Sequence, residues 1–469
     1  MKRIVALLIL TLVTAVAVTA EPTARKVRIK GGKSYMYRLT LCDKKGTPCT
    51  TDHPEEFLSA RAIERRNRQG IAPDSTDLPL SPVYIAQVQA LGVNIVCGSK
   101  WNNTIVVQLA ADSCRALLAA LTELDCVVAA KKVWTSPDSV VIPRRERMAG
   151  LMHKWDTISA DRHGRAFEQT ALLGGTALHE AGYTGDGIMI AVMDGGFMNA
   201  DQIRAFLSMN RVGVKDLVVP ASPDVFAEMK HGTQVLSVMA ANLPGVYVGT
   251  APDAGYLLLR CENGDGESLV EEDFWAAAAE YADSMGVDVI NSSLGFHDFD
   301  TAADNYSYAC QDGCTAMISR TASMLAAKGI VLVCSAGNEG MDTWKKINFP
   351  ADAHDVLAVG AVSADGINAA FSSVGPTADG RIKPDIMAPG SPTAVITGRG
   401  TIGKDVGTSF AAPIVAGLVA CLWQALPDKT AVEIMDLVRR SGNNSDRPDN
   451  IYGYGVPDFV KALEMGRDE

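Results

Sequence analysis

Short apolar runs separated by amphipathic stretches organise most of this chain. From about residue 170 onward, five runs have the length and uninterrupted apolar character of strands that are buried on both faces. They are Gly187–Met193, Gly255–Arg260, Val287–Asn291, Ile330–Cys334 and Val356–Val362. Helical stretches alternate with these strands or follow them, at about 231–242, 269–285, 315–328, 408–425 and 430–440. This alternation predicts an α/β fold with a mostly parallel central sheet and helices on both faces.

The first part of the chain has a different pattern. Residues 35–41 alternate apolar and polar side chains, as a half-buried strand does, and a basic helical stretch follows at about 54–69. Further helices are predicted at 81–91 and 114–124, and further strands at 93–96, 104–109 and 126–130. This order predicts a small α+β module over residues 21–140. Residues 141–168 are polar and Arg-rich, which predicts an exposed linker before a second domain over 169–465.

The N-terminus has the pattern of an export signal. Lys2 and Arg3 precede an uncharged apolar run that ends in small residues at Ala20, which predicts a secretory signal peptide over the first 20 residues. An uncleaved anchor is the alternative, but the run is shorter than the ~20 residues of a spanning helix. Residues 411–426 are also apolar, but proline and glycine interrupt them, and they predict a buried core helix. We therefore expect an exported protein, extracellular or in the cell envelope (periplasm), without a transmembrane span after cleavage.

Charge separates the two parts of the chain. The net charge is −11, but residues 21–165 sum to +7 and residues 166–469 to −20. An acidic chain argues against nucleic acid as the partner, because binding to phosphates depends on Lys and Arg. Opposite charges on the module and the domain predict attraction between them.

Cysteine usage is ordinary for this length, with 10 Cys among 469 residues. Export permits disulfides, and two pairs are close enough in sequence to close a loop: Cys42 with Cys49, and Cys310 with Cys314. Cys334 and Cys421 lie in apolar runs and are predicted to be inert buried thiols. The sequence has no Cys-x-x-Cys and only 7 His, which argues against a structural zinc site.

Four polar residues stand at strand ends or helix starts: Asp194, His231, Asn338 and Ser409. Taken singly, each has a structural explanation, such as a turn Asp, an exposed His or an N-cap Ser. Together they supply one chemistry. A serine nucleophile needs a histidine to take its proton, and the histidine needs a carboxylate to orient it. A side-chain amide and the free N–H groups of a helix start can stabilise an oxyanion, and the chain order Asp, His, Ser is that of subtilisin.

Residues 170–460 resemble the peptidase domain of the subtilisin-like serine proteases (subtilases, peptidase family S8). Five motifs carry the resemblance: the strand into Asp194-Gly-Gly, His231-Gly-Thr, Asn291-Ser-Ser-Leu-Gly295, Ser335-Ala-Gly-Asn338 and Gly407-Thr-Ser-Phe-Ala-Ala-Pro413. The last motif is the most specific. Gly453-Tyr-Gly-Val-Pro-Asp458 resembles the usual ending of the family's domain.

The resemblance implies a role for each matching residue. Ser409 would attack the scissile carbonyl, His231 would act as general base and then acid, and Asp194 would orient His231. The Asn338 amide and the Ser409 N–H would form the oxyanion hole. Six residues would bind extended substrate and wall the pocket for the residue before the cut: Ser293, Leu294, Gly295, Ser335, Ala336 and Gly337. The small residues in both walls leave room for a sizeable, apolar side chain. One departure is Gly195, where the family more often has Ser or Thr in support of the aspartate.

The resemblance also implies a role for the first module. Comparable modules are propeptides that pack on the peptidase helices, assist folding and occupy the cleft, so we expect cleavage between residues 138 and 168; a permanent accessory domain is the alternative. The chemistry requires no cofactor. Subtilases often carry structural calcium, which makes Asp298, Asp300 and Asp304 candidate ligands, although an acidic loop is more often simply solvated.

The sequence thus predicts an exported serine endopeptidase made as a zymogen, with protein or peptide substrates and its own propeptide as an intramolecular inhibitor. Two alternatives stay open. One is an exported binding protein on a catalytically silent scaffold, against which the four intact residues argue. The other is a peptide ligase or cyclase, in which an amine instead of water takes the acyl group from the same triad.

Overall fold

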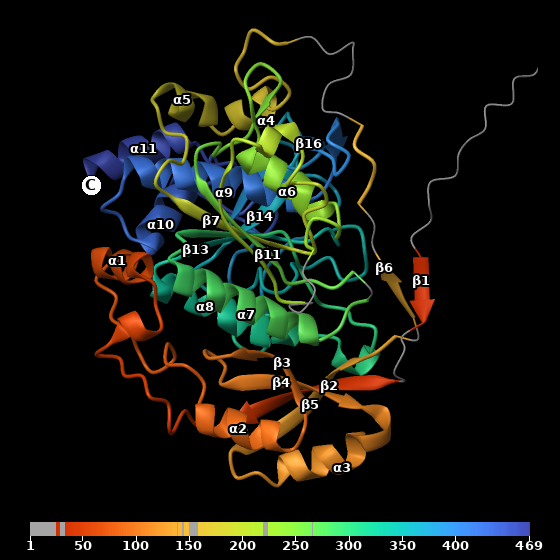
Figure 1. Ribbon diagram of the computed structural model, residues 1–469. Coiled ribbons are helices and arrows are strands. Elements are labelled where there is room, and N and C mark those ends of the chain that lie inside the picture. The colour runs from red at the N-terminus through yellow and green to blue at the C-terminus, as the bar shows by residue number, and fades with distance from the viewer. Residues whose placement is uncertain are drawn as a thin grey trace, which may run out of the picture.

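The computed structural model describes residues 25–28, 33–137, 139–142, 145–149, 158–218, 224–264 and 266–469. They form an N-terminal module (33–137) and a larger C-terminal domain (158–469), stacked one below the other in Figure 1. The predicted signal peptide, residues 1–20, and part of the predicted linker lie outside the described residues.

A seven-stranded sheet forms the centre of the C-terminal domain, in the order β15-β14-β13-β12-β7-β11-β8, and every neighbouring pair in it is parallel. The strands are β7 (Met189–Asp194), β8 (Asn210–Asp216), β11 (Gly255–Arg260), β12 (Val289–Ser292), β13 (Val331–Ser335), β14 (Leu357–Val362) and β15 (Ile386–Pro389). The five apolar runs supply five of them, and β8 and β15 add one at each edge. The predicted parallel α/β fold is therefore confirmed.

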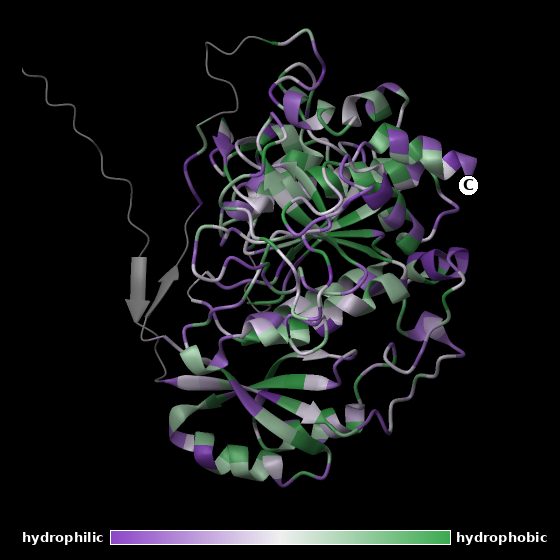
Figure 2. Ribbon diagram, turned by 180° about the vertical axis from the view of Figure 1, so that it is seen from behind, coloured by the Kyte–Doolittle hydropathy of each residue, from purple (hydrophilic) through white to green (hydrophobic). Residues whose placement is uncertain are grey.

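Helices cover both faces of this sheet because successive side chains of a strand point to opposite faces. In β7, Ile190 and Val192 pack toward α6 (His231–Ala240) and α9 (Thr408–Ala425). Ala191 and Met193 pack toward the other layer, which is described next. Both faces are apolar, so the central strands appear green throughout in Figure 2. This double burial explains why the sequence shows continuous apolar runs instead of alternation.

The second layer consists of α7 (Val270–Met285) and α8 (Met317–Met324), below the sheet in Figure 1. In the first layer, α9 is the one helix among the described residues that is long and apolar enough to cross a membrane, and 83% of it is buried inside the protein. It is the core helix that the sequence predicts.

Shorter elements complete the C-terminal domain and the segment before it. The helices are α4 (Phe167–Ala171), α5 (Gly175–Glu180), α10 (Ala431–Ser441) and α11 (Phe459–Asp468). The antiparallel strand pairs are β9 (Asn242–Leu243) with β10 (Tyr247–Val248), β16 (Thr393–Ile396) with β17 (Ile402–Asp405), and β1 (Arg25–Arg28) with β6 (Ser139–Ile142). Turns of 3₁₀ helix occur at Pro54–Glu56, Arg204–Phe206, Ala302–Asp304, Tyr308–Cys310 and Ala326–Lys328.

The N-terminal module is a four-stranded antiparallel sheet, ordered β3-β4-β2-β5, with two helices on its outer face. Its elements are β2 (Ser34–Leu41), α1 (Ala60–Arg68), α2 (Pro82–Ala90), β3 (Asn94–Ser99), β4 (Thr104–Ala110), α3 (Ala111–Thr122) and β5 (Val127–Thr135). Ile105 and Val107 face α2 and α3, whereas Val106 joins the core around α7. The module therefore packs its inner face on the helix layer of the C-terminal domain (Figure 1).

Polar contacts fix the module on α7. The buried Glu280 carboxylate accepts hydrogen bonds from the backbone N–H groups of Lys100 (2.8 Å) and Trp101 (3.0 Å). Arg38 donates to both carboxylate oxygens of Asp273, each at 2.7 Å. Basic residues of the module thus meet acidic residues of the domain, as the opposite net charges predict.

A second anchor lies on α1, beside the end of α7. Ser59 caps α1 and accepts from the Ala62 N–H, so the helix is shorter than the predicted 54–69. Arg65 and Arg66, each 1% exposed, both bind the fully buried Asp283 at N–O distances of 2.6 and 2.8 Å. Arg66 also pairs with Asp77 of its own module at 2.8 Å. We call these four side chains the arginine clamp.

The predicted linker is not wholly exposed. The Ala149 N–H donates to the Arg399 carbonyl, and Arg145 pairs with Asp201 at 2.9 Å. The Ser159 N–H donates to the Gly245 carbonyl at 2.8 Å. Backbone hydrogen bonds of this kind hold a polar segment on the surface although it has no apolar period.

The two cysteine pairs that are close in sequence do not form disulfides, since all ten cysteines are free thiols. The Cys42 sulfur faces the Tyr84 hydroxyl at 3.7 Å, and the Cys310 sulfur lies 3.5 Å from the Ser307 hydroxyl. The thiols of Cys334 and Cys421 are fully buried, as predicted.

Breaking the arginine clamp should destabilise the whole chain. Arg65→Met removes one of the three cations around the buried Asp283, the others being Arg66 and Lys100, and the loss of one partner of a buried ion pair costs about 3–5 kcal/mol. Arg68→Met is the matched control, because Arg68 is 35% exposed and lies 3.6 Å from Asp288; its loss should cost at most about 1 kcal/mol. Urea unfolding in a Ser409→Ala background measures both. Equal losses in the two variants would contradict a buried clamp.

Candidate active site

The four polar residues singled out in the sequence lie at one edge of the central sheet. Asp194 is the last residue of β7, Asn338 follows β13, His231 begins α6 and Ser409 lies in the first turn of α9. The carboxyl ends of parallel strands meet at the same edge, and the ligand sites of open α/β sheets lie there. The fold therefore gathers residues that are far apart in the sequence.

Asp194 and His231 form a direct pair. The Nδ1 atom of His231 lies 2.9 Å from Oδ2 and 3.1 Å from Oδ1 of Asp194, whose side chain is fully buried. The Gly195 N–H donates to Oδ1 at 2.8 Å, so a backbone group supports the carboxylate. Burial by itself lowers the pKa of His231, but the Asp194 charge and hydrogen bond outweigh it and raise the pKa to about 9.

The Ser409 hydroxyl is turned away from this pair. Its Oγ donates to the Ser293 carbonyl at 3.2 Å, and among the described residues it makes no hydrogen bond to His231. The next residue, Phe410, has its ring 5.7 Å from the His231 ring. The structure thus brings Asp194 and His231 into contact and places Ser409 beside them, with its hydroxyl in another orientation.

The Asn338 side chain is held by the start of α9. Its Oδ1 accepts from the Thr408 N–H at 2.9 Å and from the Thr408 hydroxyl at 3.1 Å. These bonds assign the oxygen end of the amide, so the Nδ2 donor points away from Thr408. The residue is exposed, and within the described part of the chain Nδ2 has no acceptor.

The six predicted substrate-binding residues form two walls. Ser293, Leu294 and Gly295 follow β12, and Ser335, Ala336 and Gly337 end β13 and lead to Asn338. A methyl group added to Gly295 would lie 2.9 Å from Asn348 Cβ, and one added to Gly337 would lie 3.1 Å from Asn348 Cγ. The two walls therefore meet at Asn348.

Asn348 thus places a polar side chain where the two walls meet, whereas the resemblance implies room for an apolar substrate side chain. The residue is 5% exposed, and its Oδ1 is buried without a hydrogen-bond partner among the described residues. Sequence reasoning missed it because Asn348 stands in no motif. Its position follows only from the contact of the two walls, which lie about forty residues apart.

A further carboxylate stands beside the Asp194–His231 pair. A methyl group added to Gly195 would lie 2.7 Å from Glu262 Oε2 and 2.5 Å from Met229 Sδ, closer than real contacts allow. Glu262 thus occupies the space that a side chain at position 195 would need. Burial and repulsion by Asp194 raise the pKa of Glu262 to about 7.

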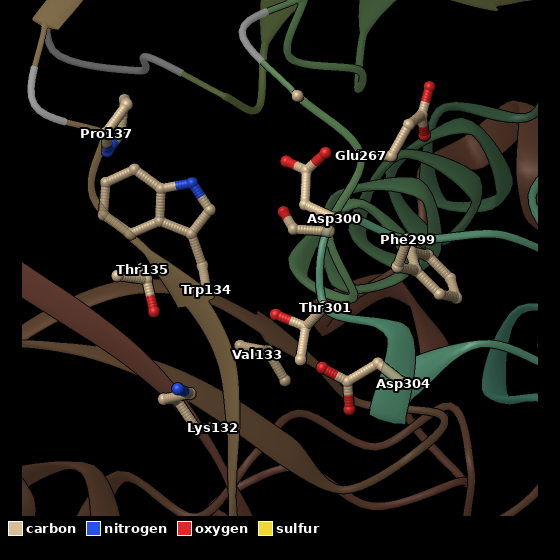
Figure 3. Close-up of a pocket in the computed structure, with 12 residues that line it drawn as sticks. Lys132, Val133, Trp134, Thr135, Pro137, Glu267, Phe299, Asp300, Thr301 and Asp304 are labelled. Carbon is tan, nitrogen blue, oxygen red and sulfur yellow. The ribbon is translucent and has the colours of Figure 1, made fainter.

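The N-terminal module reaches this edge of the domain with its last residues. Figure 3 shows Trp134 and Pro137 beside a pocket whose other side is formed by Glu267, Asp300 and Thr301. Ser136 is pinned to β2, because its hydroxyl accepts from the Ser34 N–H at 2.8 Å. The module therefore ends along the loop that begins at Glu262.

The three candidate calcium ligands do not converge on one point. Asp298 accepts from the Asn305 amide, and Asp304 pairs with Lys131 of the module at 3.7 Å. Asp300 lines the pocket of Figure 3 beside Gly266. In the part of the chain that the structure describes, no group of three or more His, Cys, Asp or Glu side chains could hold a metal ion. These residues do not fit a calcium site.

Family models match both parts of the chain. The model described as "Subtilase family" matches residues 185–455, which is more than half of the chain. The model described as "Peptidase S8 propeptide domain, Bacteroidota" matches residues 36–145.

Curated relatives match more than half of the chain. Subtilisin NAT of Bacillus subtilis subsp. natto is 32% identical over 265 residues, which are 55% of this chain and 61% of the relative. Serine protease AprX of Bacillus subtilis (strain 168) is 30% identical over 303 residues, 58% of this chain and 65% of the relative. The chain thus spans less than two thirds of the length of these two relatives. Subtilisin of Bacillus pumilus is 31% identical over 265 residues, 55% of this chain and 85% of the relative.

A solved structure has the same fold. It is described as "Structure of MycP3 protease from the type VII (ESX-3) secretion system" and aligns with a TM-score of 0.53 at 22% sequence identity. The alignment covers 69% of this chain and 93% of that chain.

The pKa of His231 should depend on Asp194. In a Ser409→Ala background, NMR titration of the His231 ring should give a pKa near 9. Asp194→Asn removes the charge that raises the pKa and leaves the burial that lowers it, so the pKa should fall to or below the ordinary value of about 6.5. Asp186→Asn, which removes an exposed carboxylate, should leave it unchanged. An unchanged pKa in Asp194→Asn would show that the two side chains do not interact.

Proposed function

Because this chain belongs to the subtilase family of serine peptidases, we propose that it is an exported serine endopeptidase, made as a zymogen, that hydrolyses peptide bonds through Ser409. The observation that carries the proposal is the hydrogen-bonded Asp194–His231 pair at the edge of the sheet that also holds Ser409 and the Asn338 amide. A buried carboxylate on Nδ1 leaves Nε2 of the same ring to accept a proton from a serine.

The first step is attack by Ser409 on the scissile carbonyl carbon. Its hydroxyl turns from the Ser293 carbonyl toward His231, and the proton passes to Nε2 as the Oγ–C bond forms. His231 accepts a proton only when it is neutral, so the fraction of active base increases as the pH rises toward about 9. Asp194 stabilises the imidazolium that results.

The negative charge that develops on the carbonyl oxygen is then stabilised by hydrogen-bond donors. The Asn338 Nδ2 group is free for this because Thr408 binds the other end of the amide. The Ser409 N–H lies in the first turn of α9, where the helix supplies no carbonyl partner. Both donors are fixed before the reaction, so they need no reorganisation when the charge develops.

The acyl group is transferred in two steps, first to Ser409 and then to water. His231 returns its proton to the leaving amine, and the C–N bond breaks to leave an ester on Ser409. Water then attacks the ester, His231 takes its proton, and the acid product leaves with the Ser409 hydroxyl restored. Residues 293–295 support extended substrate by main-chain pairing, which does not depend on the substrate's sequence.

The N-terminal module acts as the propeptide in this proposal. Its last residues lie along the loop that begins at Glu262, and residues 145–149 contact the domain again at Asp201 and Arg399. The chain between these contacts belongs to the stretch over 138–168 in which we expect cleavage. Lys2, Arg3 and the apolar run after them support export before activation.

Replacing the nucleophile should abolish both cleavages. Purified Ser409→Ala should hydrolyse neither casein nor a peptide library, and its chain should stay uncut, whereas the unmodified chain should show a new N-terminus between residues 138 and 168 on protein sequencing. Ser445→Ala, outside the site, should behave as the unmodified protein. Equal turnover by Ser409→Ala would overturn the mechanism. Mass spectrometry of the products separates hydrolysis, which adds water, from ligation, which adds an amine.

Removing the oxyanion donor should lower kcat more than it raises KM. Asn338→Leu keeps the size of the side chain but not the N–H donor, and one such donor contributes about 10²–10³-fold to kcat. Steady-state kinetics on a peptide substrate measure the two constants. An unchanged kcat would remove Asn338 from the oxyanion hole.

A further inference from the structure

Glu262 is an ionisable group beside the Asp194–His231 pair that the mechanism above does not use. It follows β11, is half-buried, and its carboxylate has no hydrogen bond or ion pair with any described residue. Its position is tied to Gly195, because any side chain there would collide with Glu262 Oε2. The departure from the family pattern at position 195 therefore makes room for this carboxylate.

The strand order shows which part of a substrate would meet Glu262. The sheet runs β13-β12-β7-β11, so its carboxyl edge presents in turn the wall at 335–337, the wall at 293–295, Asp194 with His231, and Glu262. The pocket for the residue before the cut lies between the first two. Glu262 lies beyond the catalytic pair, on the opposite side.

An extended substrate points successive side chains to opposite sides. When the residue before the cut enters the pocket that ends at Asn348, the preceding residue must point the other way. That direction is toward His231 and Glu262. We call this preceding residue P2.

The electrostatics of Glu262 favour a cation at this place. Its carboxylate shares the edge with Asp194, and its pKa is raised because burial and this repulsion oppose a negative charge there. A positive side chain that approaches Glu262 stabilises the ionised form and restores the interactions lost on desolvation.

We propose that Glu262 makes the enzyme selective for substrates with Arg or Lys at P2; this inference rests on the proposed function. The chain's own cleavage region has the matching chemistry. Its sequence carries Arg144, Arg145 and Arg147 within four residues, so a P2 preference for basic residues would favour processing there.

The test compares paired peptides that differ only at P2, where one carries Arg and the other citrulline, its uncharged isostere. The unmodified enzyme should cleave the Arg peptide with a kcat/KM about tenfold higher or more. Glu262→Gln should bring the ratio of the two kcat/KM values close to one. Because each ratio is taken within one enzyme, a general loss of rate in the variant does not affect it.

Two controls separate a local contact from the acidity of the whole domain. Glu267→Gln removes an exposed carboxylate from the same loop and should keep the original ratio. Moving the Arg four residues beyond the cut should abolish the preference in the unmodified enzyme. A ratio near one in the unmodified enzyme, or an unchanged ratio in Glu262→Gln, would falsify the proposal. Failure of the proposed function looks different, since neither peptide would then be cleaved by any of these proteins.

Discussion

The whole structure depends on burying a seven-stranded parallel sheet on both faces. Apolar side chains point up to α6 and α9 and down to α7 and α8, so a polar group between these layers loses its hydration. Polar chemistry is therefore confined to the ends of the strands. The carboxyl edge holds Asp194 and Asn338, while the outer surface of α7 is left to bind the N-terminal module. One constraint thus fixes both where catalysis can occur and where the inhibitor can sit.

The sequence predicted the central strands well because burial on both faces leaves a continuous apolar run. It missed the two edge strands for different reasons. In β8, residues such as Asn210 and Arg211 face solvent, so the strand shows no apolar run. β15 is buried throughout, but it has only four residues and ends in Pro389, so its apolar run is too short to stand out. The basic stretch at 54–69 was predicted to be helical, but its sequence does not show which of its arginines are buried. In the structure Arg65 and Arg66 are buried and both pair with Asp283. The local sequence could not show this, because Asp283 lies more than two hundred residues away in the sequence.

The candidate site also has features that the sequence predicts and features that it does not. Asp194, His231, Asn338 and Ser409 each stand in a local motif, and sequence reasoning could group them by the chemistry that they share. The orientation of the Ser409 hydroxyl, the polar pocket end at Asn348 and the placement of Glu262 depend on contacts between distant segments. At position 195 the sequence showed a glycine where the family more often has Ser or Thr. Only the packing shows that a carboxylate fills the space.

The arginine clamp lies away from the carboxyl edge, and this separation has a consequence for timing. Substitutions at Arg65 or Asp283 can change how long the module stays bound without touching any group that takes part in turnover. In the proposed function the connecting chain is cut, and the module is then no longer held at the high effective concentration of a tethered partner. Its departure then depends on dilution, and Asp283 becomes hydrated as the two parts separate. The volume into which the protein is released would therefore set how long the cut module stays bound and the enzyme stays inhibited. Substitutions in the arginine clamp would change this time without changing the catalytic residues.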